Sequence, residues 1–299
     1  MNDIKLQMKS KAADIEKIIY RYLPPVEGYQ KTIFDAMDYS LKAGGKRLRP
    51  MLMNETFKML GGSGDVIEPF MAAIEMIHTY SLVHDDLPAM DNDMLRRGKP
   101  TTHAVYGEAM GVLAGDALLN YAFETALLAF DKNAADAMTI AKALKVLSTK
   151  AGVYGMIGGQ VVDVESEKNG DVMDLERVHF VYELKTGALI EASMMIGAIL
   201  AGADDNTVSS IETVALNLGL AFQIQDDILD IEGDETILGK PIGSDEKNKK
   251  ATYVSYVGLE KSKEKVRRLT DEAINELKQI SGSNDFLIEL MNYLVYRNN

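Results

Sequence analysis

The chain has 299 residues, of which 46% are hydrophobic and 26% charged, a composition typical of a globular protein with ample apolar material for a core. Its formal net charge of −13 disfavours nucleic acid or an anionic membrane surface as a partner, so a small anion would need local cations or bound metal ions. The absence of cysteine excludes disulfides, thiolate metal sites and a cysteine nucleophile.

The predicted elements, taken in chain order, are almost all helices. Apolar residues recur at helical spacings from Ile4 to Tyr22, and the prolines at positions 24 and 25 end that helix. Further segments are rich in Ala, Leu, Met, Ile and Glu: 66–87, 103–130, 134–151, 174–201, 207–230, 260–280 and 285–297. Polar and glycine-rich turns separate them, and no linker is long enough to divide two domains. We therefore predict a single all-α domain over residues 1–299, a bundle of roughly ten or more helices.

The location of the protein is predicted from its apolar stretches. The first twenty residues are charged throughout and lack the apolar centre of a signal peptide. The longest apolar stretch, 194–203, falls well short of the ~20 residues that cross a bilayer. We expect a cytoplasmic protein without a membrane span. The longest irregular segment, 232–250, is polar, and we expect it to be a functional loop that closes over a ligand.

Aspartates crowd the stretch HDDLPAMDND at 84–93. The apolar run that leads to Asp85 predicts a helix, and Pro88 cannot donate the hydrogen bond that would continue it. A break at Pro88 would allow Asp91 to turn back toward Asp85 and Asp86. Taken alone, such a cluster would be interpreted as a capped helix end with solvated acids.

A second acidic cluster changes that interpretation. The stretch AFQIQDDILD at 221–230 places Asp226, Asp227 and Asp230 at the end of another apolar helix. Asp226 and Asp230 share a helix face, where like charges repel unless a cation lies between them. Carboxylate oxygens without histidine or thiolate partners suit Mg²⁺, which often bridges to phosphate oxygens. We predict that the two clusters form facing walls of one cavity.

Candidate anion-binding cations complement these acids. The stretch GGKRLRP at 44–50 supplies Lys46, Arg47 and Arg49, and arginine makes bidentate contacts to phosphate oxygens. His78 lies seven residues before Asp85, two turns along the same helix face. Each signal alone has a plainer interpretation, because basic loops are usually solvated and lone histidines are usually satisfied in a core.

Together these motifs resemble the trans-prenyltransferase (polyprenyl diphosphate synthase) family, and within it most of all the bacterial farnesyl diphosphate synthases. The resemblance covers nearly the whole chain, in the order GGKRLRP, IHTYSLVHDDLPAMDNDMLRRGKPT, LAGDALL, GGQVVDV, KTGALI, FQIQDDILD and GKPIGSD. It implies a mostly antiparallel helical bundle around a deep central cavity, assembled as a homodimer. The implied reaction joins dimethylallyl or geranyl diphosphate to isopentenyl diphosphate, head to tail.

The resemblance also implies roles for individual residues. It implies that about two or three Mg²⁺ ions, with Mn²⁺ as an alternative ion, are bound by the two aspartate-rich motifs. The implied metal ligands are Asp85, Asp86, Asp91, Asp226, Asp227 and Asp230. The implied contacts to the allylic diphosphate are Arg96 and the catalytic set Lys185, Thr186, Gln223 and Lys240. The implied isopentenyl diphosphate site is Lys46, Arg49, His78 and Arg97, with Arg47 nearby.

Product length is expected to depend on the helix that carries Asp85. Tyr80, five residues upstream, is bulky enough to stop chain growth, with Ser81 beside it. Four residues separate Asp86 from Asp91, the longer spacing of the bacterial farnesyl enzymes. Both features favour a C15 product; the alternative role for Tyr80 is ordinary core packing.

Several alternatives remain open at this point. A geranylgeranyl diphosphate synthase would use the same chemistry with a deeper cavity. A non-catalytic partner subunit would be expected to lose one acidic motif, and both are intact here. A terpene cyclase needs no isopentenyl diphosphate site, so the 44–50 motif and His78 argue against it. A phosphohydrolase built on the histidine–aspartate pair at 84–85 has no second such pair in the sequence.

Overall fold

The computed structural model describes residues 2–132, 135–169, 173–232, 251–280, 282 and 285–296. In these residues helices dominate, and the strands form one two-stranded hairpin, so the predicted all-α class is confirmed. The chain divides into two compact units. The N-terminal unit comprises Lys5–Asn54 and Ser63–Leu144, and the C-terminal unit comprises Met1–Ile4, Glu55–Gly62 and Lys145–Asn299. The single domain over 1–299 stays a prediction.

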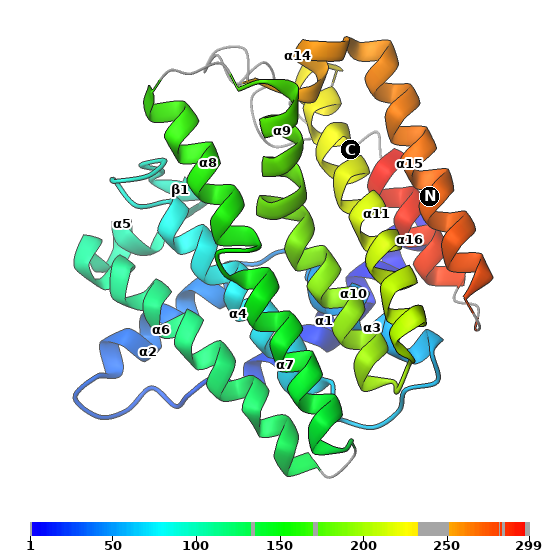
Figure 1. Ribbon diagram of the computed structural model, residues 1–299. Coiled ribbons are helices and arrows are strands. Elements are labelled where there is room, and N and C mark those ends of the chain that lie inside the picture. Colours follow the sequence, from blue (N-terminus) through cyan, green and yellow to red (C-terminus); the bar gives the residue numbers. More distant parts are fainter. Residues whose placement is uncertain are drawn as a thin grey trace. The chain divides into compact units, whose positions relative to one another are not determined.

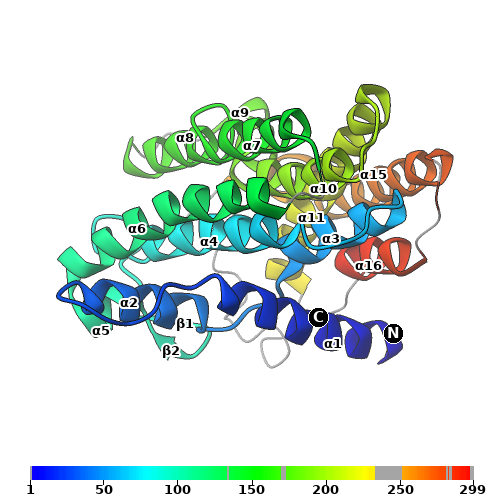
Figure 2. The same ribbon diagram turned by 90° about the horizontal axis from the view of Figure 1, so that it is seen from below.

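The first half of the chain forms short and long helices and the hairpin (Figures 1 and 2). The bounds are α1 (Asn2–Arg21), α2 (Lys31–Leu41), α3 (Leu48–Met59), α4 (Glu68–Asp85), β1 (Leu95–Arg96), β2 (Lys99–Pro100), α5 (Thr102–Tyr106), α6 (Glu108–Leu127), the 3₁₀ helix η1 (Leu128–Lys132) and α7 (Ala137–Ala151). The predicted helix over 103–130 is interrupted at Gly107, whose φ of 87° ends α5 and starts α6.

Helices α4 and α6 pack side by side in the N-terminal unit, as Figure 2 shows. Helix α4 is apolar on nearly every face and is therefore buried along most of its length. The face of α6 that is buried carries small residues, among them Gly111, Ala114 and Gly115. A Cβ on Gly115 would lie 2.0 Å from His84 Nε2, so glycine is required there for the close approach of α4.

Helix α6 also has an apolar exposed face. Val112, Leu113 and Leu127 are between 43% and 50% exposed. Within the described residues, the stretch Glu108–Lys132 is the one helix long and apolar enough to cross a membrane by composition alone. Its other face packs against α2 and α4, which is how a core helix of a folded domain behaves.

The C-terminal unit contains the remaining described elements. Their bounds are α8 (Met156–Asn169), α9 (Leu175–Val181), the π-helix η2 (Tyr182–Gly187), α10 (Ala188–Leu200), α11 (Asp205–Glu232), α14 (Tyr253–Val257), α15 (Leu259–Gln279) and α16 (Asp285–Tyr296). The predicted helix over 174–201 is observed as the continuous run α9–η2–α10. Its π-helical turn was not predicted.

Helix α11 lies at the centre of this unit, between α10 and α15 (Figure 1). Every residue of α10 is buried, as its unbroken apolar sequence requires. Helix α15 buries only one stripe, with Val266, Leu269 and Ala273 facing inward and charged residues facing solvent. Its neighbours α10 and α15 therefore cover two sides of α11.

Candidate active site

The first acidic motif lies at the C-terminal end of α4, where the chain turns back on itself after Pro88. The backbone N–H of Asp91 donates to the carbonyl of Asp85 at 2.8 Å, and that of Asp93 donates to the carbonyl of Asp86 at 3.1 Å. The prediction that a break at Pro88 returns Asp91 toward Asp85 is confirmed. The motif is therefore a compact turn with the carboxylates of Asp91 and Asp93 exposed to solvent.

Asp86 differs from the other acids of this motif because it is only 3% exposed. Arg96 Nε donates to both of its carboxylate oxygens, at 2.8 and 3.0 Å, and Arg96 Nη2 lies 2.6 Å from Oδ1. Burial raises the pKa of Asp86 although Arg96 acts in the opposite direction. The structure thus brings together an expected metal ligand and an expected diphosphate contact as a bidentate ion pair.

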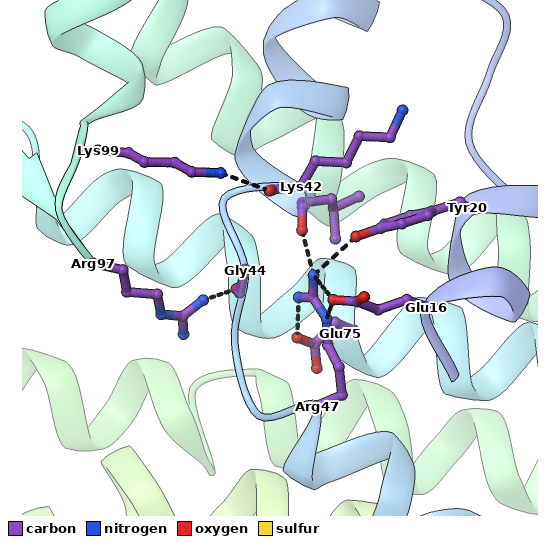
Figure 3. Close-up of polar contacts among 9 residues, drawn as sticks. Glu16, Tyr20, Lys42, Gly44, Arg47, Glu75, Arg97 and Lys99 are labelled. Carbon is purple, nitrogen blue, oxygen red and sulfur yellow. Dashed lines mark hydrogen bonds and ion pairs between the residues drawn. The ribbon is translucent and has the colours of Figure 1, made fainter. Parts of the chain in front are cut away.

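Arg96 and Arg97 are positioned by the β1–β2 hairpin. Arg97 and Gly98 form its two-residue turn, and both have positive φ, 55° and 75°, as a type I′ turn requires. Two side chains tie this hairpin to the loop before α3: Arg97 Nη1 donates to the Gly44 carbonyl, and Lys99 Nζ donates to the Lys42 carbonyl at 3.3 Å (Figure 3). The hairpin and the loop therefore hold each other.

Arg49 and His78 form the inner part of the predicted isopentenyl diphosphate site, with Arg97 beside them. Burial and the charge of Arg97 lower the pKa of Arg49 to about 10. Burial and then the charges of Arg49 and Arg97 lower the pKa of His78 well below its usual value. Arg49 Nε is buried and finds no hydrogen-bond partner among the described residues. Two arginines beside a neutral histidine fit an anionic ligand, because an added anion would relieve both the repulsion between Arg49 and Arg97 and the missing hydrogen bond.

Arg47, expected near this site, is only 2% exposed, and its guanidinium makes four hydrogen bonds (Figure 3). Nη1 donates to Glu75 at 2.8 Å and Nε donates to Glu16 at 3.0 Å. Nη2 donates to the Leu41 carbonyl at 2.7 Å and to the Tyr20 hydroxyl at 3.3 Å. Lys46, by contrast, is exposed.

The second acidic motif borders a cavity of about 220 Å³ within the C-terminal unit. Its lining includes Lys185 and Thr186 from η2 and Gln223 and Asp226 from α11, all of them predicted site residues. The Thr186 hydroxyl donates to Gln223 Oε1 at 2.9 Å. A π-helical turn, which is frequent at functional sites, carries Lys185 and Thr186 into this cavity.

The three aspartates of this motif have different surroundings. Asp226 is half-buried and lines the cavity, whereas Asp227 and Asp230 are 5% and 2% exposed. The Tyr182 hydroxyl donates to Asp227 Oδ2 at 2.5 Å, and the backbone N–H of Tyr253 donates to the same oxygen at 3.1 Å. Asp227 therefore links η2 to the beginning of α14.

Lys185 is paired with a residue that the sequence interpretation missed. Its Nζ donates to Asp163 Oδ2 at 2.6 Å, and Asp163 is only 3% exposed. Gly159 lies one turn earlier on the same face of α8, and a Cβ there would meet the backbone N of Lys185 at 2.3 Å. The stretch GGQVVDV thus admits the η2 backbone at Gly159 and supplies its counter-charge four residues later.

The donor chemistry of the two motifs fits Mg²⁺. All their side-chain donors are carboxylate oxygens, which a hard cation prefers. In the part of the chain that the structure describes, no three His, Asp or Glu side chains form a ready-made metal cage. Mg²⁺ commonly takes one or two carboxylates and completes its shell with water and phosphate oxygens, so dispersed carboxylates fit an ion that bridges to a diphosphate. The metal ligands, and the facing of the two motifs, stay predictions.

Tyr80, the expected chain-length residue, is 5% exposed on α4. Its ring meets that of His84 edge to face with centroids 5.7 Å apart, and its hydroxyl is buried without a hydrogen-bond partner among the described residues. Burial and the charge of Asp85 raise the pKa of Tyr80 to about 12. The Ser81 hydroxyl donates to the His78 carbonyl at 2.9 Å. Lys240 and the predicted closing loop at 232–250 lie outside the described residues, except for the end of α11.

Comparison with known proteins identifies the family. The model of the polyprenyl synthetase family matches residues 30–291. The chain belongs to the polyprenyl synthetase family. The chain is therefore a prenyl diphosphate synthase.

Individual family members are similar over most of their length. A farnesyl diphosphate synthase of Geobacillus stearothermophilus is 47% identical over 84% of this chain and 84% of its own. A geranylgeranyl diphosphate synthase of Cyanophora paradoxa is 44% identical over 95% of this chain and 93% of its own. The crystal structure of a Helicobacter pylori geranyltransferase complexed with magnesium and isoprenyl diphosphate superposes with a TM-score of 0.81, at 34% identity over 96% of this chain and 95% of that one. The family and the all-α fold predicted from the motifs are confirmed.

Proposed function

We propose that this polyprenyl synthetase condenses isopentenyl diphosphate with dimethylallyl and then geranyl diphosphate to give farnesyl diphosphate. The observation that carries the proposal is the pair of cations Arg49 and Arg97 beside the neutral imidazole of His78, an arrangement that suits a diphosphate without metal ions. An enzyme that only ionises an allylic diphosphate has no need of such a second anion site. The proposal is supported by the farnesyl diphosphate synthase among its relatives.

The allylic diphosphate is assigned to the cavity lined by Lys185, Thr186, Gln223 and Asp226. Mg²⁺ bound by Asp226 would neutralise the diphosphate in this cavity and act as a Lewis acid on its oxygens. Asp85 and Asp91 are the proposed Mg²⁺ ligands of the first acidic motif. Lys185 is held by Asp163 within reach of this cavity and contributes a fixed positive charge toward the leaving group.

The chemical step needs no protein nucleophile. The allylic C–O bond breaks, and its electron pair leaves with the diphosphate. The double bond of isopentenyl diphosphate then forms the new C–C bond, and the resulting cation loses a proton, which the departed diphosphate can accept. The Thr186 hydroxyl donates a hydrogen bond to Gln223 Oε1, so the lone pairs of the hydroxyl oxygen remain available to stabilise the allylic cation.

We propose that Tyr80 limits the product to C15, because its buried ring lies on α4 more than one turn before Asp85. The rival product is geranylgeranyl diphosphate, and the Cyanophora paradoxa relative favours it as directly as the Geobacillus relative favours farnesyl diphosphate. The side chain at Tyr80 is the feature that supports the shorter product, because a buried aromatic ring would block further growth.

We also propose a homodimer, supported by the exposed apolar face of α6. Val112, Leu113 and Leu127, exposed apolar side chains of one helix, would be covered in a dimer. Leu113→Glu should shift the protein toward monomer in sedimentation velocity, whereas Leu6→Glu, at an exposed leucine of α1, should not. The cytoplasmic location expected from the sequence stays a prediction.

The deciding experiment is incubation with isopentenyl diphosphate, dimethylallyl diphosphate and Mg²⁺, followed by chain-length analysis. A C15 product supports the proposal, a C20 product supports the rival, and no condensation rejects both. Asp85→Ala and Asp226→Ala should each lower turnover by orders of magnitude. Asp65→Ala, which breaks an exposed pair with Lys132, is the matched control and should retain full activity.

A further inference from the structure

The loop 44–49 contains an arginine that the proposed reaction does not use directly. Arg47 lies between Lys46 and Arg49, yet its guanidinium is buried and donates to Glu16, Glu75, Leu41 and Tyr20. Four of its five N–H donors are used in these bonds, and Arg47 is only 2% exposed, so a substrate phosphate has little access to the guanidinium. Its role at the site must therefore be indirect.

The partner Glu75 explains what that role is. Glu75 lies on α4 three residues before His78, so the two side chains occupy the same helix face. The side chain of Glu75 is 4% exposed, and its negative charge acts to raise the pKa of Arg49 and Arg97 as well as that of Arg47. A buried carboxylate among the cations of an anion site would repel the anion unless another cation compensates it.

Arg47 is built to supply that compensation. It forms the closest ion pair of Glu75, at 2.8 Å, and the pKa of Arg47 is raised by Glu75 although burial acts to lower it. Arg47 also adopts a φ of 49°, a left-handed conformation that costs a non-glycine residue roughly 1–2 kcal/mol. Four hydrogen bonds from the side chain hold the loop in this conformation.

We propose that Arg47 is a positioning residue of the isopentenyl diphosphate site, which neutralises Glu75 and fixes the loop so that Arg49 and His78 remain available to the diphosphate. The inference rests on the proposed function, because it concerns the same site. It differs from the sequence expectation, which placed Arg47 among the substrate-binding residues. Figure 3 shows the geometry: Arg47 points toward α1 and α4, whereas Arg97 reaches the loop from the hairpin.

The test measures binding of isopentenyl diphosphate by calorimetry in EDTA, together with KM for isopentenyl and geranyl diphosphate in Mg²⁺. Arg47→Met should weaken isopentenyl diphosphate binding about tenfold or more, with KM for geranyl diphosphate changed less than about twofold. In the double variant Arg47→Met with Glu75→Gln, most of the lost affinity should return, because the uncompensated carboxylate is gone. Rescue of this kind is not expected if Arg47 contacts the substrate itself.

The controls separate charge from folding. Arg21→Met breaks an exposed bidentate pair with Glu68 between the same two helices and should leave both KM values unchanged. If Arg47→Met fails to fold, Arg47→Lys and Glu75→Gln replace it. Arg47→Lys keeps the charge and should bind isopentenyl diphosphate with most of the wild-type affinity, and Glu75→Gln should bind it at least as tightly as the wild type.

The outcomes distinguish this inference from the proposed function. A wild-type protein that does not bind isopentenyl diphosphate overturns both. A wild type that binds and condenses, combined with a double variant no better than Arg47→Met, overturns the positioning role alone. Equal effects of Arg47→Met on both KM values also overturn it, because they indicate a general loss of structure.

Discussion

The contact between Gly45 and Arg97 permits a stringent prediction about the isopentenyl diphosphate site. A Cβ at Gly45 would lie 2.7 Å from Arg97 Nη1 and 3.2 Å from its Cζ. An ordinary contact needs about 3.5 Å, so the Gly45→Ala variant must displace the guanidinium by roughly 0.8 Å. That displacement moves Arg97 Nη1, which donates to the Gly44 carbonyl, away from its position in the isopentenyl diphosphate site.

Gly44→Ala is the matched control, because it shares the backbone strain of Gly45→Ala but not the steric clash with Arg97. Gly44 and Gly45 both have positive φ, 100° and 144°, so either alanine strains the backbone by about 1–3 kcal/mol. A Cβ at Gly44 meets nothing within 4 Å. Both variants should therefore lose similar stability in urea denaturation, while only Gly45→Ala moves Arg97.

The magnitude follows from the contact that Arg97 would make to the diphosphate. A bond from a charged donor contributes about 1.5–3 kcal/mol, and we expect the misplaced Arg97 to lose a comparable contact to the diphosphate. KM for isopentenyl diphosphate should rise about tenfold or more in Gly45→Ala and less than about twofold in Gly44→Ala. Steady-state kinetics with geranyl diphosphate held saturating provides the measurement.

Two results would refute this reasoning. Equal KM increases in the two variants would mean that loop strain, not the position of Arg97, controls binding. Full additivity of Gly45→Ala with Arg97→Ala would mean that the glycine acts elsewhere, because two changes to one contact should not add.

Three further predictions concern buried polar groups. Tyr80→Phe removes a buried hydroxyl without a partner among the described residues, so it should be at least as stable as the wild type and should keep the C15 product. Tyr80→Ala should lower the free energy of unfolding by about 3–5 kcal/mol and lengthen the product. An unchanged C15 product in Tyr80→Ala would contradict the proposal that this side chain stops chain growth. The pKa of His78 in the folded protein is depressed below the unfolded value of 6.5, so the unfolded state binds more protons and stability is lost as pH falls below 6.5. Urea denaturation at neutral pH and at about pH 5 should therefore show a smaller acid loss for His78→Gln than for the wild type, by up to about 1.4 kcal/mol per pH unit, and equal losses would exclude His78 as the cause. Tyr182→Phe removes the hydroxyl that donates to Asp227 and accepts from the N–H of Tyr253, so it should lower the free energy of unfolding by about 1.5–3 kcal/mol. A variant as stable as the wild type would show that these hydrogen bonds do not contribute to stability.

The features that sequence alone predicted are those that depend on neighbours along the chain. The 3.6-residue apolar period located α4, α11 and α15 to within a few residues. The turn after Pro88 was also predictable, because a proline at that point leaves the chain few alternatives, and Asp91 returns to Asp85 as expected. The order of the motifs was sufficient to identify the family.

The tertiary structure decided which partner each charged side chain meets. Arg47 pairs with Glu75, 28 residues away, and Lys185 pairs with Asp163, 22 residues away. No local spacing predicts such pairs, because they depend on how closely two helices approach. Gly159 shows the physical reason: the absence of one Cβ admits the backbone of Lys185, and that approach brings Asp163 to its ammonium group. Residue types and spacing therefore determined the helices and the motifs, whereas close packing determined which of the arginines and aspartates serve the substrate and which serve each other.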